Sequence, residues 1–304
     1  MTIVCIVSYA SIQGRVLGAS GGLFMRLLRP IEVRAKQLSW IATGPLVDLF
    51  DPAAAAFYER LVSHGYEPDI LLNVLPSQRL LYVVVPKAAS TRIRHTLARI
   101  AGRRILSLKP SRRRKFSGPH GPRSMTKSSF FHLATSPETL RFSFVRDPYA
   151  RAVSCWADKF RGKPLVAGDR FIDIYLARRQ DIAPELPAGP DRTLTFAEFV
   201  VFLAAVATSR CDIHFQTQDD ILSMPGIALD FVGKVETFAQ DFARVLEHLG
   251  ASETLRHEAT LPMNESHHDH WASYYTHELA DRIYRAYECD FDRFAYPRAY
   301  TSVP

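Results

Sequence analysis

The chain lacks the features that mark disulfide-rich, zinc-binding and membrane-spanning proteins. It has 4 cysteines in 304 residues, and none of them belongs to a CxxC pair, so neither a disulfide framework nor a zinc site is indicated. No uninterrupted apolar run reaches the roughly 18 residues that a membrane span needs. Arg15, Arg26 and Arg29 interrupt the apolar N-terminal stretch. These absences predict a soluble protein in a reducing compartment.

The N-terminal stretch also fits a signal peptide badly, because it has no early basic segment and no clear small-residue cleavage site. We therefore expect a cytoplasmic location. A role of this stretch as an interfacial amphipathic segment, in peripheral contact with the inner membrane, stays open as an alternative. Residues 1–75 are interpreted as a mostly helical extension, and residues 76–304 as the main domain.

Acidic residues are missing from a long part of the chain. No Asp or Glu occurs between Asp69 and Glu138, whereas 14 Lys or Arg do, in a protein whose formal net charge is +7. Such a segment attracts anions. The run from Arg112 to Lys115 is explained equally well as solvated surface. A noncatalytic protein that binds polyanions is therefore one alternative for the function.

Short apolar runs alternate with helical patterns. The runs that read as buried strands are residues 80–85, 142–145 and 231–235. Apolar residues at helical spacing follow each of them, over residues 90–101, 148–160 and 238–249. Strands that alternate with helices predict a three-layer α/β fold with a central, mainly parallel sheet, whose ligands bind at the carboxyl ends of the strands.

Further helices are predicted in the second half of the chain. Thr195 and Glu198 have the spacing of a capping box and predict a helix over residues 196–208. Leu279, Ile283, Tyr287 and Phe291 mark the face of a last helix.

The segment 86–91, with the sequence PKAAST, lies where a phosphate-binding loop belongs, between a strand and the start of a helix. The hydroxyls of Ser90 and Thr91 can donate to nonbridging oxygens, and the Lys87 ammonium can approach a leaving oxygen as negative charge develops there. The loop is not a Walker A motif, because the glycines of GxxxxGK[ST] are missing and the lysine precedes the hydroxyl pair. This disfavours a nucleotide or small-molecule kinase, the main alternative within the same fold.

A second constellation, RDPYARAVSCW, begins at Arg146 where the next strand ends. Asp147 is a plausible N-cap, and Pro148 stands at the favoured first helical position. Arg146 offers a planar set of donors to a phosphate, and Ser154 lies two helical turns further along. The pattern predicts a second phosphate, distinct from the first.

Together, the two motifs resemble the 5′-phosphosulfate and 3′-phosphate loops of sulfotransferases that use 3′-phosphoadenosine-5′-phosphosulfate (PAPS). Three later stretches, CDIHFQTQ, DFVGKVETFAQDFARVLEHLG and YYTHELADRIYRAYECDFDRFAYP, are similar to the Golgi-type carbohydrate sulfotransferases, which include the chondroitin, dermatan and HNK-1 enzymes. The resemblance covers about residues 80 to 297.

The resemblance implies a P-loop-like α/β fold, PAPS as sulfuryl donor with 3′-phosphoadenosine-5′-phosphate (PAP) as product, and a hydroxyl of a carbohydrate or glycoconjugate as acceptor. It implies neither a metal nor a nucleic-acid partner. The residues expected to bind the donor are Pro86, Lys87, Ala88, Ala89, Ser90, Thr91, Arg92, Arg146 and Ser154. Lys87 is also expected to act in catalysis.

Sulfuryl transfer further needs a base that takes the acceptor proton. His132 stands in an aromatic-rich context between the two loops, as the catalytic histidine of the related uronyl 2-O-sulfotransferases does, and is the favoured candidate. His120 is the second candidate, and His214 is expected to contact the acceptor. A structural histidine hydrogen-bonded to the backbone is the competing explanation for His132. His267, His268 and His270 lack partners at metal-ligand spacing and are not interpreted as a metal site.

Two departures from the Golgi-type pattern are visible. Those relatives usually carry an N-terminal membrane anchor, and they have a cysteine shortly after the segment that matches HFQTQ, where this chain has Asp219 to Ser223. Both differences favour a cytoplasmic, bacterial version and leave the identity of the acceptor open.

Overall fold

A four-stranded sheet forms the centre of the protein in the residues that the structure describes, which are 51–102, 121–208, 212–260 and 269–299 of this computed structural model. The strands lie in the order β1 (Leu72–Leu75), β2 (Leu80–Val83), β3 (Leu140–Val145) and β4 (Phe231–Lys234). The edge strand β1 is antiparallel to β2, whereas β2, β3 and β4 are parallel. The predicted α/β fold with a mainly parallel sheet is confirmed.

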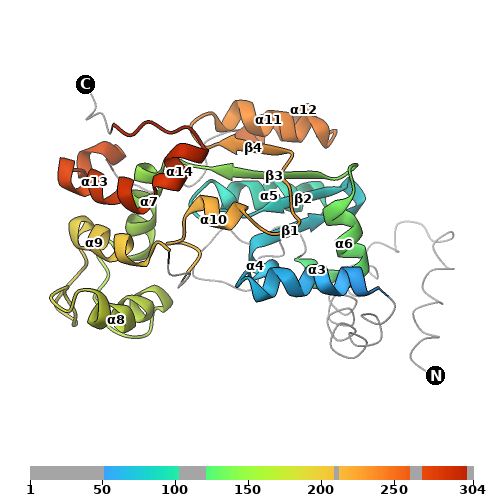
Figure 1. The fold of residues 1–304 in the computed structure, drawn as a ribbon. Helices are drawn as coiled ribbons and strands as arrows, with labels where there is room; N and C mark the ends of the chain where they lie inside the picture. Colours follow the sequence, from blue (N-terminus) through green and yellow to red (C-terminus); the bar gives the residue numbers. More distant parts are fainter. Residues whose placement is uncertain (1–50, 103–120, 209–211, 261–268, 300–304) are drawn as a thin grey trace, which may run out of the picture.

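The strands are apolar on both sides because the sheet is covered on both faces. Successive residues of β2 alternate between two core clusters: Leu81 and Val83 belong to one, Leu80 and Tyr82 to the other. Figure 1 shows the resulting layers, with α11 and α12 along one side of the sheet and α3 and α4 along the other. This arrangement explains the continuous apolar runs in the sequence.

The helices have the following bounds. Those that precede β3 are α3 (Pro52–Ser63), α4 (Pro68–Leu71), α5 (Ser90–Ile100) and α6 (Lys127–Thr135). Those between β3 and β4 are α7 (Pro148–Lys159), α8 (Arg170–Ile182), α9 (Phe196–Val206) and α10 (Gln218–Leu222). Those after β4 are α11 (Phe238–His248), α12 (Glu253–Thr260), α13 (His277–Ala286) and α14 (Glu288–Arg293).

The predicted helix starts are confirmed where the signal is local. The carboxylate of Asp147 accepts a hydrogen bond from the backbone N–H of Ala150, and Pro148 is the first residue of α7. Thr195 and Glu198 form the expected reciprocal capping box at the start of α9.

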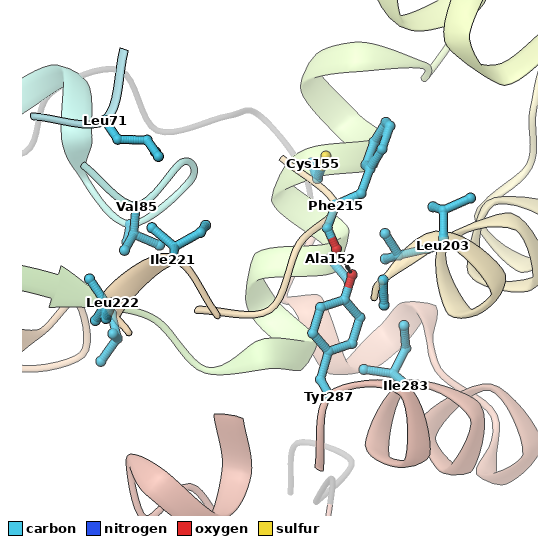
Figure 2. Close-up of a cluster of buried hydrophobic side chains, with 14 of the residues drawn as sticks. Leu71, Val85, Ala152, Cys155, Leu203, Phe215, Ile221, Leu222, Ile283 and Tyr287 are labelled. Atoms are coloured by element: carbon cyan, nitrogen blue, oxygen red, sulfur yellow. Dashed lines mark hydrogen bonds between the residues drawn. The ribbon is translucent and has the colours of Figure 1, made fainter. Parts of the chain in front are cut away.

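The last helix differs from the expectation, because α13 ends before Tyr287 and α14 starts after it. The hydroxyl of Tyr287 donates a 2.5 Å hydrogen bond to the carbonyl of Phe215 inside the core, as Figure 2 shows. Tyr287 has φ −122° and ψ 22°, which is not helical. A buried tertiary contact thus accompanies a break that the apolar periodicity does not reveal.

The boundary expected at residue 76 separates two strands that pair with each other. Val74 lies opposite Leu81 in the antiparallel β1–β2 pair, and Phe57 and Leu61 of α3 belong to the main core cluster. Residues 51–75 therefore pack with the sheet, whereas the remainder of the expected extension, residues 1–50, is outside the described part. No helix within the described ranges is long and apolar enough to cross a membrane.

Candidate functional site

The loop between β2 and α5 holds two non-glycine residues in the left-handed region, Lys87 with φ 68° and Ala89 with φ 55°. Side chains rarely adopt this conformation, and such residues cluster at ligand-binding sites. Ala89 is followed by helical Ser90, and this alternation of left- and right-handed residues turns successive backbone N–H groups toward one side, which suits an anion. No side chain caps the first turn of α5, so the positive end of that helix faces the same loop.

The Lys87 ammonium forms an ion-pair cluster with two residues of α7, Asp158 and Lys159. Its Nζ donates to Oδ2 of Asp158 at 3.1 Å, and Nζ of Lys159 lies 2.8 Å from the same oxygen. Burial lowers the pKa of Lys87, and Asp158 opposes that shift. Burial acts to raise the pKa of Asp158, but the two lysines hold it at about 2. The loop therefore carries a net positive charge at neutral pH.

Arg146, at the end of β3, is positioned through its backbone. Its N–H donates to Oε1 of Gln218 at 2.9 Å, and Nε2 of Gln218 donates to its carbonyl at 2.8 Å. The N–H of Gln218 in turn donates to the fully buried carboxylate of Asp290. One guanidinium nitrogen of Arg146 lies 3.5 Å from the carbonyl oxygen of Lys87. The two loops that the sequence singles out are thus neighbours at the carboxyl ends of β2 and β3.

Two acidic residues, the buried Asp147 and the exposed Glu236, support the start of α7. The N–H of Asp147 donates to Oε1 of Glu236 at 2.9 Å, and the hydroxyl of Tyr296 donates to Oε2 of Glu236 at 2.9 Å. Burial, reinforced by the charge of Glu236, raises the pKa of Asp147 to about 6. The ammonium of Lys234 lies 4.4 Å from the centre of the Tyr296 ring. Residues 233–237, with the sequence GKVET, therefore support the backbone of the Arg146 loop.

Arg151, one turn into α7, connects the Lys87 loop to a third segment. Its buried guanidinium donates to the carbonyl of Pro86 at 3.1 Å and to that of Gln216 at 2.8 Å. It also donates to the carbonyls of Ile213 and His214, at 3.3 and 3.5 Å. The segment CDIHFQTQ is thereby brought against the loop that carries Lys87.

His214 lies on this third segment and faces an acidic partner. Its Nδ1 is 2.7 Å from Oδ1 of Asp212, whose side chain is fully buried. Oδ2 of Asp212 accepts a 2.7 Å hydrogen bond from Arg170. The rings of His214 and Phe171 pack nearly perpendicular to each other, with 4.9 Å between ring centres. Phe215, the next residue, is anchored in the core cluster of Figure 2.

The other expected site residues have different placements. Ser90 and Thr91 are the first residues of α5, and Ala88 is a buried residue of the preceding loop. The guanidinium of Arg92 lies 4.9 Å from the centre of the Phe238 ring. Ser154 is buried in α7, two turns beyond Arg146.

Of the two histidines expected as base, only His132 lies in the described part of the chain. His132 is exposed on α6, and Figure 1 shows this helix at the end of the sheet where β3 begins, whereas Lys87 and Arg146 follow the ends of their strands. His120 is outside the described residues, as are His267 and His268.

The family model described as "Sulfotransferase family" matches residues 71–297. The chain belongs to this sulfotransferase family. The match includes the Lys87 loop, the Arg146 loop and the segment with His214. Among curated proteins, this sulfotransferase-family chain is similar to mouse carbohydrate sulfotransferase 14, with 30% identity over 77% of the chain and 62% of the relative. It is also similar to mouse carbohydrate sulfotransferase 11, with 26% identity over 74% of the chain and 66% of the relative.

The chain spans just under two thirds of the length of these relatives. No solved structure matches it. In the described part of this sulfotransferase-family chain, no group of three or more His, Cys, Asp or Glu side chains is arranged to hold a metal ion.

Several residues that organise the site escaped the sequence reasoning. Asp158 and Lys159 lie at the end of α7, where they look like ordinary surface charges. Gln218 and Asp290 are polar residues within otherwise unremarkable helices. A weak signal existed for Asp212, because an acidic residue two positions before His214 can reach its ring.

Proposed function

We propose that the protein transfers a sulfuryl group from PAPS to a hydroxyl of a carbohydrate. The observation that carries the proposal is the contact between the two anion-binding loops, in which the guanidinium of Arg146 reaches the carbonyl of Lys87. A donor with one phosphosulfate and one separate phosphate needs two neighbouring cationic sites of this kind. Family membership and the carbohydrate sulfotransferases among the relatives support the same reaction class.

The residues divide the work between binding and charge stabilisation. The N–H groups at the start of α5, with Ser90 and Thr91, would hold the 5′-phosphosulfate, and Arg146 with Ser154 would hold the 3′-phosphate. The buried Lys87 ammonium would neutralise the charge that develops on the leaving phosphate oxygen. PAPS, when bound, supplies the sulfuryl group. Transfer of this kind depends on in-line positioning rather than on a covalent enzyme intermediate.

Calorimetric titration with PAP tests the donor site without knowledge of the acceptor. We expect PAP to bind the wild type and adenosine-5′-phosphate to bind at least tenfold more weakly, because the latter lacks the phosphate assigned to Arg146. The variants Lys87→Ala and Arg146→Ala should weaken PAP binding at least tenfold, about 1.4 kcal/mol. Arg178→Ala, an exposed arginine of α8, is the matched control and should bind PAP like the wild type.

Transfer itself is measured with labelled PAPS and a panel of desulfated chondroitin, desulfated dermatan, lipopolysaccharide and small glycosides. Label is expected in at least one carbohydrate, without added metal. A folded wild type that does not bind PAP, or one that transfers phosphate from ATP and magnesium instead, would overturn the proposal.

A further inference from the structure

The proposed sulfuryl transfer requires a proton acceptor beside the attacking hydroxyl. The described histidines differ in how they are connected to the Lys87 loop. His132 is exposed on α6, which packs against α3. The pKa of Asp51, the N-cap of α3, is lowered by a hydrogen bond with Ser128 and, to a smaller extent, by the charge of His132. His132 thus lies on a helix that precedes β3 and packs against α3, whereas Arg146 follows the end of β3.

His214 is tied to the donor loop through one side chain. The guanidinium of Arg151 donates a hydrogen bond to the carbonyl of Pro86, the residue before Lys87, and another to the carbonyl of His214. A second path runs through rings and charges: Lys159 shares the carboxylate of Asp158 with Lys87, and its ammonium lies 4.4 Å from the centre of the Phe171 ring. That ring is the one on which His214 packs.

The Asp212 carboxylate sets the state of the imidazole. An ionised carboxylate only accepts hydrogen bonds, so the 2.7 Å contact places the proton of neutral His214 on Nδ1. Nε2 is then the unprotonated nitrogen, the one that can take a proton from a hydroxyl. The guanidinium of Arg170 donates a hydrogen bond to the other carboxylate oxygen, and its positive charge keeps Asp212 ionised. The side chain of His214 is 22% exposed, so solvent or a ligand reaches it.

The surrounding charges act in both directions on His214. Burial lowers its pKa most, Asp212 raises it, and Lys159 and Lys87 lower it further. The charged groups around the ring are thus Asp212, Arg170 of α8, Lys159 with Asp158 on α7, and Lys87. The net effect is a pKa below the ordinary histidine value, which leaves the ring neutral and able to accept a proton at neutral pH.

We propose that His214, rather than His132 or His120, is the base of the reaction, and that Asp212 is its positioning residue. In this step the acceptor O–H gives its proton to Nε2 of His214, and the oxygen forms a bond to sulfur. The bond between sulfur and the bridging phosphate oxygen breaks, and PAP leaves with that electron pair, beside Lys87. The inference rests on the proposed function, because it needs PAPS as the donor.

The test compares His214→Ala with His132→Ala, an equally small truncation of an exposed histidine, in the full-length protein. The rate of label transfer from PAPS is measured with whichever carbohydrate of the panel accepts the most, and PAP binding is measured by calorimetry. His214→Ala is expected to lower kcat by about 100-fold or more while PAP binding changes less than threefold. His132→Ala should leave both unchanged, and added imidazole should restore part of the activity of His214→Ala.

The variant Asp212→Asn tests whether Asp212 sets the pKa and orientation of the His214 ring or only stabilises the fold. Because Asp212 raises the pKa of His214, its neutralisation should move the acidic limb of the kcat/KM profile to lower pH and reduce kcat. Nitrogen-15 NMR of the histidines gives an acceptor-free readout, in which the His214 ring should show the Nδ1–H form and respond to PAP, with no response from His132.

Each outcome bears on one proposal or the other. A His214→Ala variant that binds PAP and transfers sulfate as fast as the wild type overturns the assignment of the base. So does a His132→Ala variant that loses as much activity as His214→Ala. A folded wild type that neither binds PAP nor transfers sulfate overturns the proposed function instead.

Discussion

The ammonium of Lys87 donates a 3.1 Å hydrogen bond to the carboxylate of Asp158, a residue 71 positions further along the chain. The Lys87 side chain is only 15% exposed, whereas that of Asp158 is 46% exposed. The carboxylate therefore acts as the counter-ion of the lysine on the side that solvent reaches. A phosphate or sulfate that enters the loop competes with Asp158 for the same ammonium.

Asp158→Asn should consequently bind PAP more tightly. Removal of one negative charge close to the bound phosphate is worth about 1 kcal/mol, or about fivefold in affinity. The same change leaves Lys87 and Lys159 without their shared counter-ion, so the free protein should melt at a lower temperature, and PAP should raise its melting temperature more than that of the wild type. Calorimetry and thermal unfolding measure the two effects. Asp181→Asn, an exposed acid of α8, is the control; weaker PAP binding by Asp158→Asn would contradict the competition.

Asp147 should make stability depend on pH in an unusual direction. Burial first, and then Glu236, raises its pKa to about 6 from an ordinary value of 3.8. The folded state then binds more protons than the unfolded state between these values, so the contribution of Asp147 is present below pH 3.8 and is lost as pH rises through 6. Asp147→Asn keeps an N-cap and removes this loss, which amounts to roughly 3 kcal/mol at most.

Urea unfolding of both proteins from pH 4 to pH 7 measures the effect of Asp147. The stability of Asp147→Asn relative to the wild type should rise across this window. A difference that stays constant with pH would mean that Asp147 titrates normally.

Arg151→Lys should weaken the connection between the Lys87 loop and the His214 segment. A lysine has the same charge but lacks the planar set of donors that serves the carbonyls of Pro86, Ile213, His214 and Gln216. Buried acceptors left without donors cost about 1 to 3 kcal/mol each. We expect a loss of roughly 2 kcal/mol or more in urea unfolding. Arg282→Lys on the exposed face of α13 should change stability by less than about 0.5 kcal/mol; equal losses in both variants would refute the role of Arg151.

Gly233→Ala should destabilise the sheet beneath the site. A Cβ atom at Gly233 would lie 2.5 Å from the ring of Phe144, which is fully buried and surrounded by Phe231, Phe238 and Phe242. Overpacking of this kind costs about 1 to 3 kcal/mol. The double variant Gly233→Ala/Phe144→Leu should lose less than the sum of the two single losses, because the smaller side chain makes room. Additive losses would place the strain elsewhere.

Local patterns account for much of what could be predicted. Helix starts can be predicted because the capping residue and its partner lie within a few residues of each other, as in Asp147 with Pro148 and Thr195 with Glu198. The apolar runs of β2, β3 and β4 are visible because both faces of the sheet are covered. The two loops at the strand ends followed directly from this pattern.

Contacts between distant segments could not be predicted in the same way. Gln218 holds the backbone of Arg146 across 72 positions, and no periodicity connects a glutamine to a strand end so far away. The break at Tyr287 has the same origin, because its hydroxyl finds the Phe215 carbonyl 72 positions away. The choice between His132 and His214 as base depends on contacts of the same kind, because no sequence pattern shows that Arg151 joins the His214 segment to the Lys87 loop.

The guanidinium of Arg151 donates to the carbonyl of Pro86, on the loop proposed to bind the sulfuryl donor, and to that of His214, on the segment proposed to face the acceptor. Ligands that each tighten one side would therefore bias the same internal bonds, and their binding free energies would be coupled. Thermodynamic linkage makes such coupling reciprocal: if PAP strengthens the binding of a sugar by some factor, the sugar strengthens the binding of PAP by that same factor. A single buried side chain would in this way make the affinity for each substrate depend on whether the other substrate is bound.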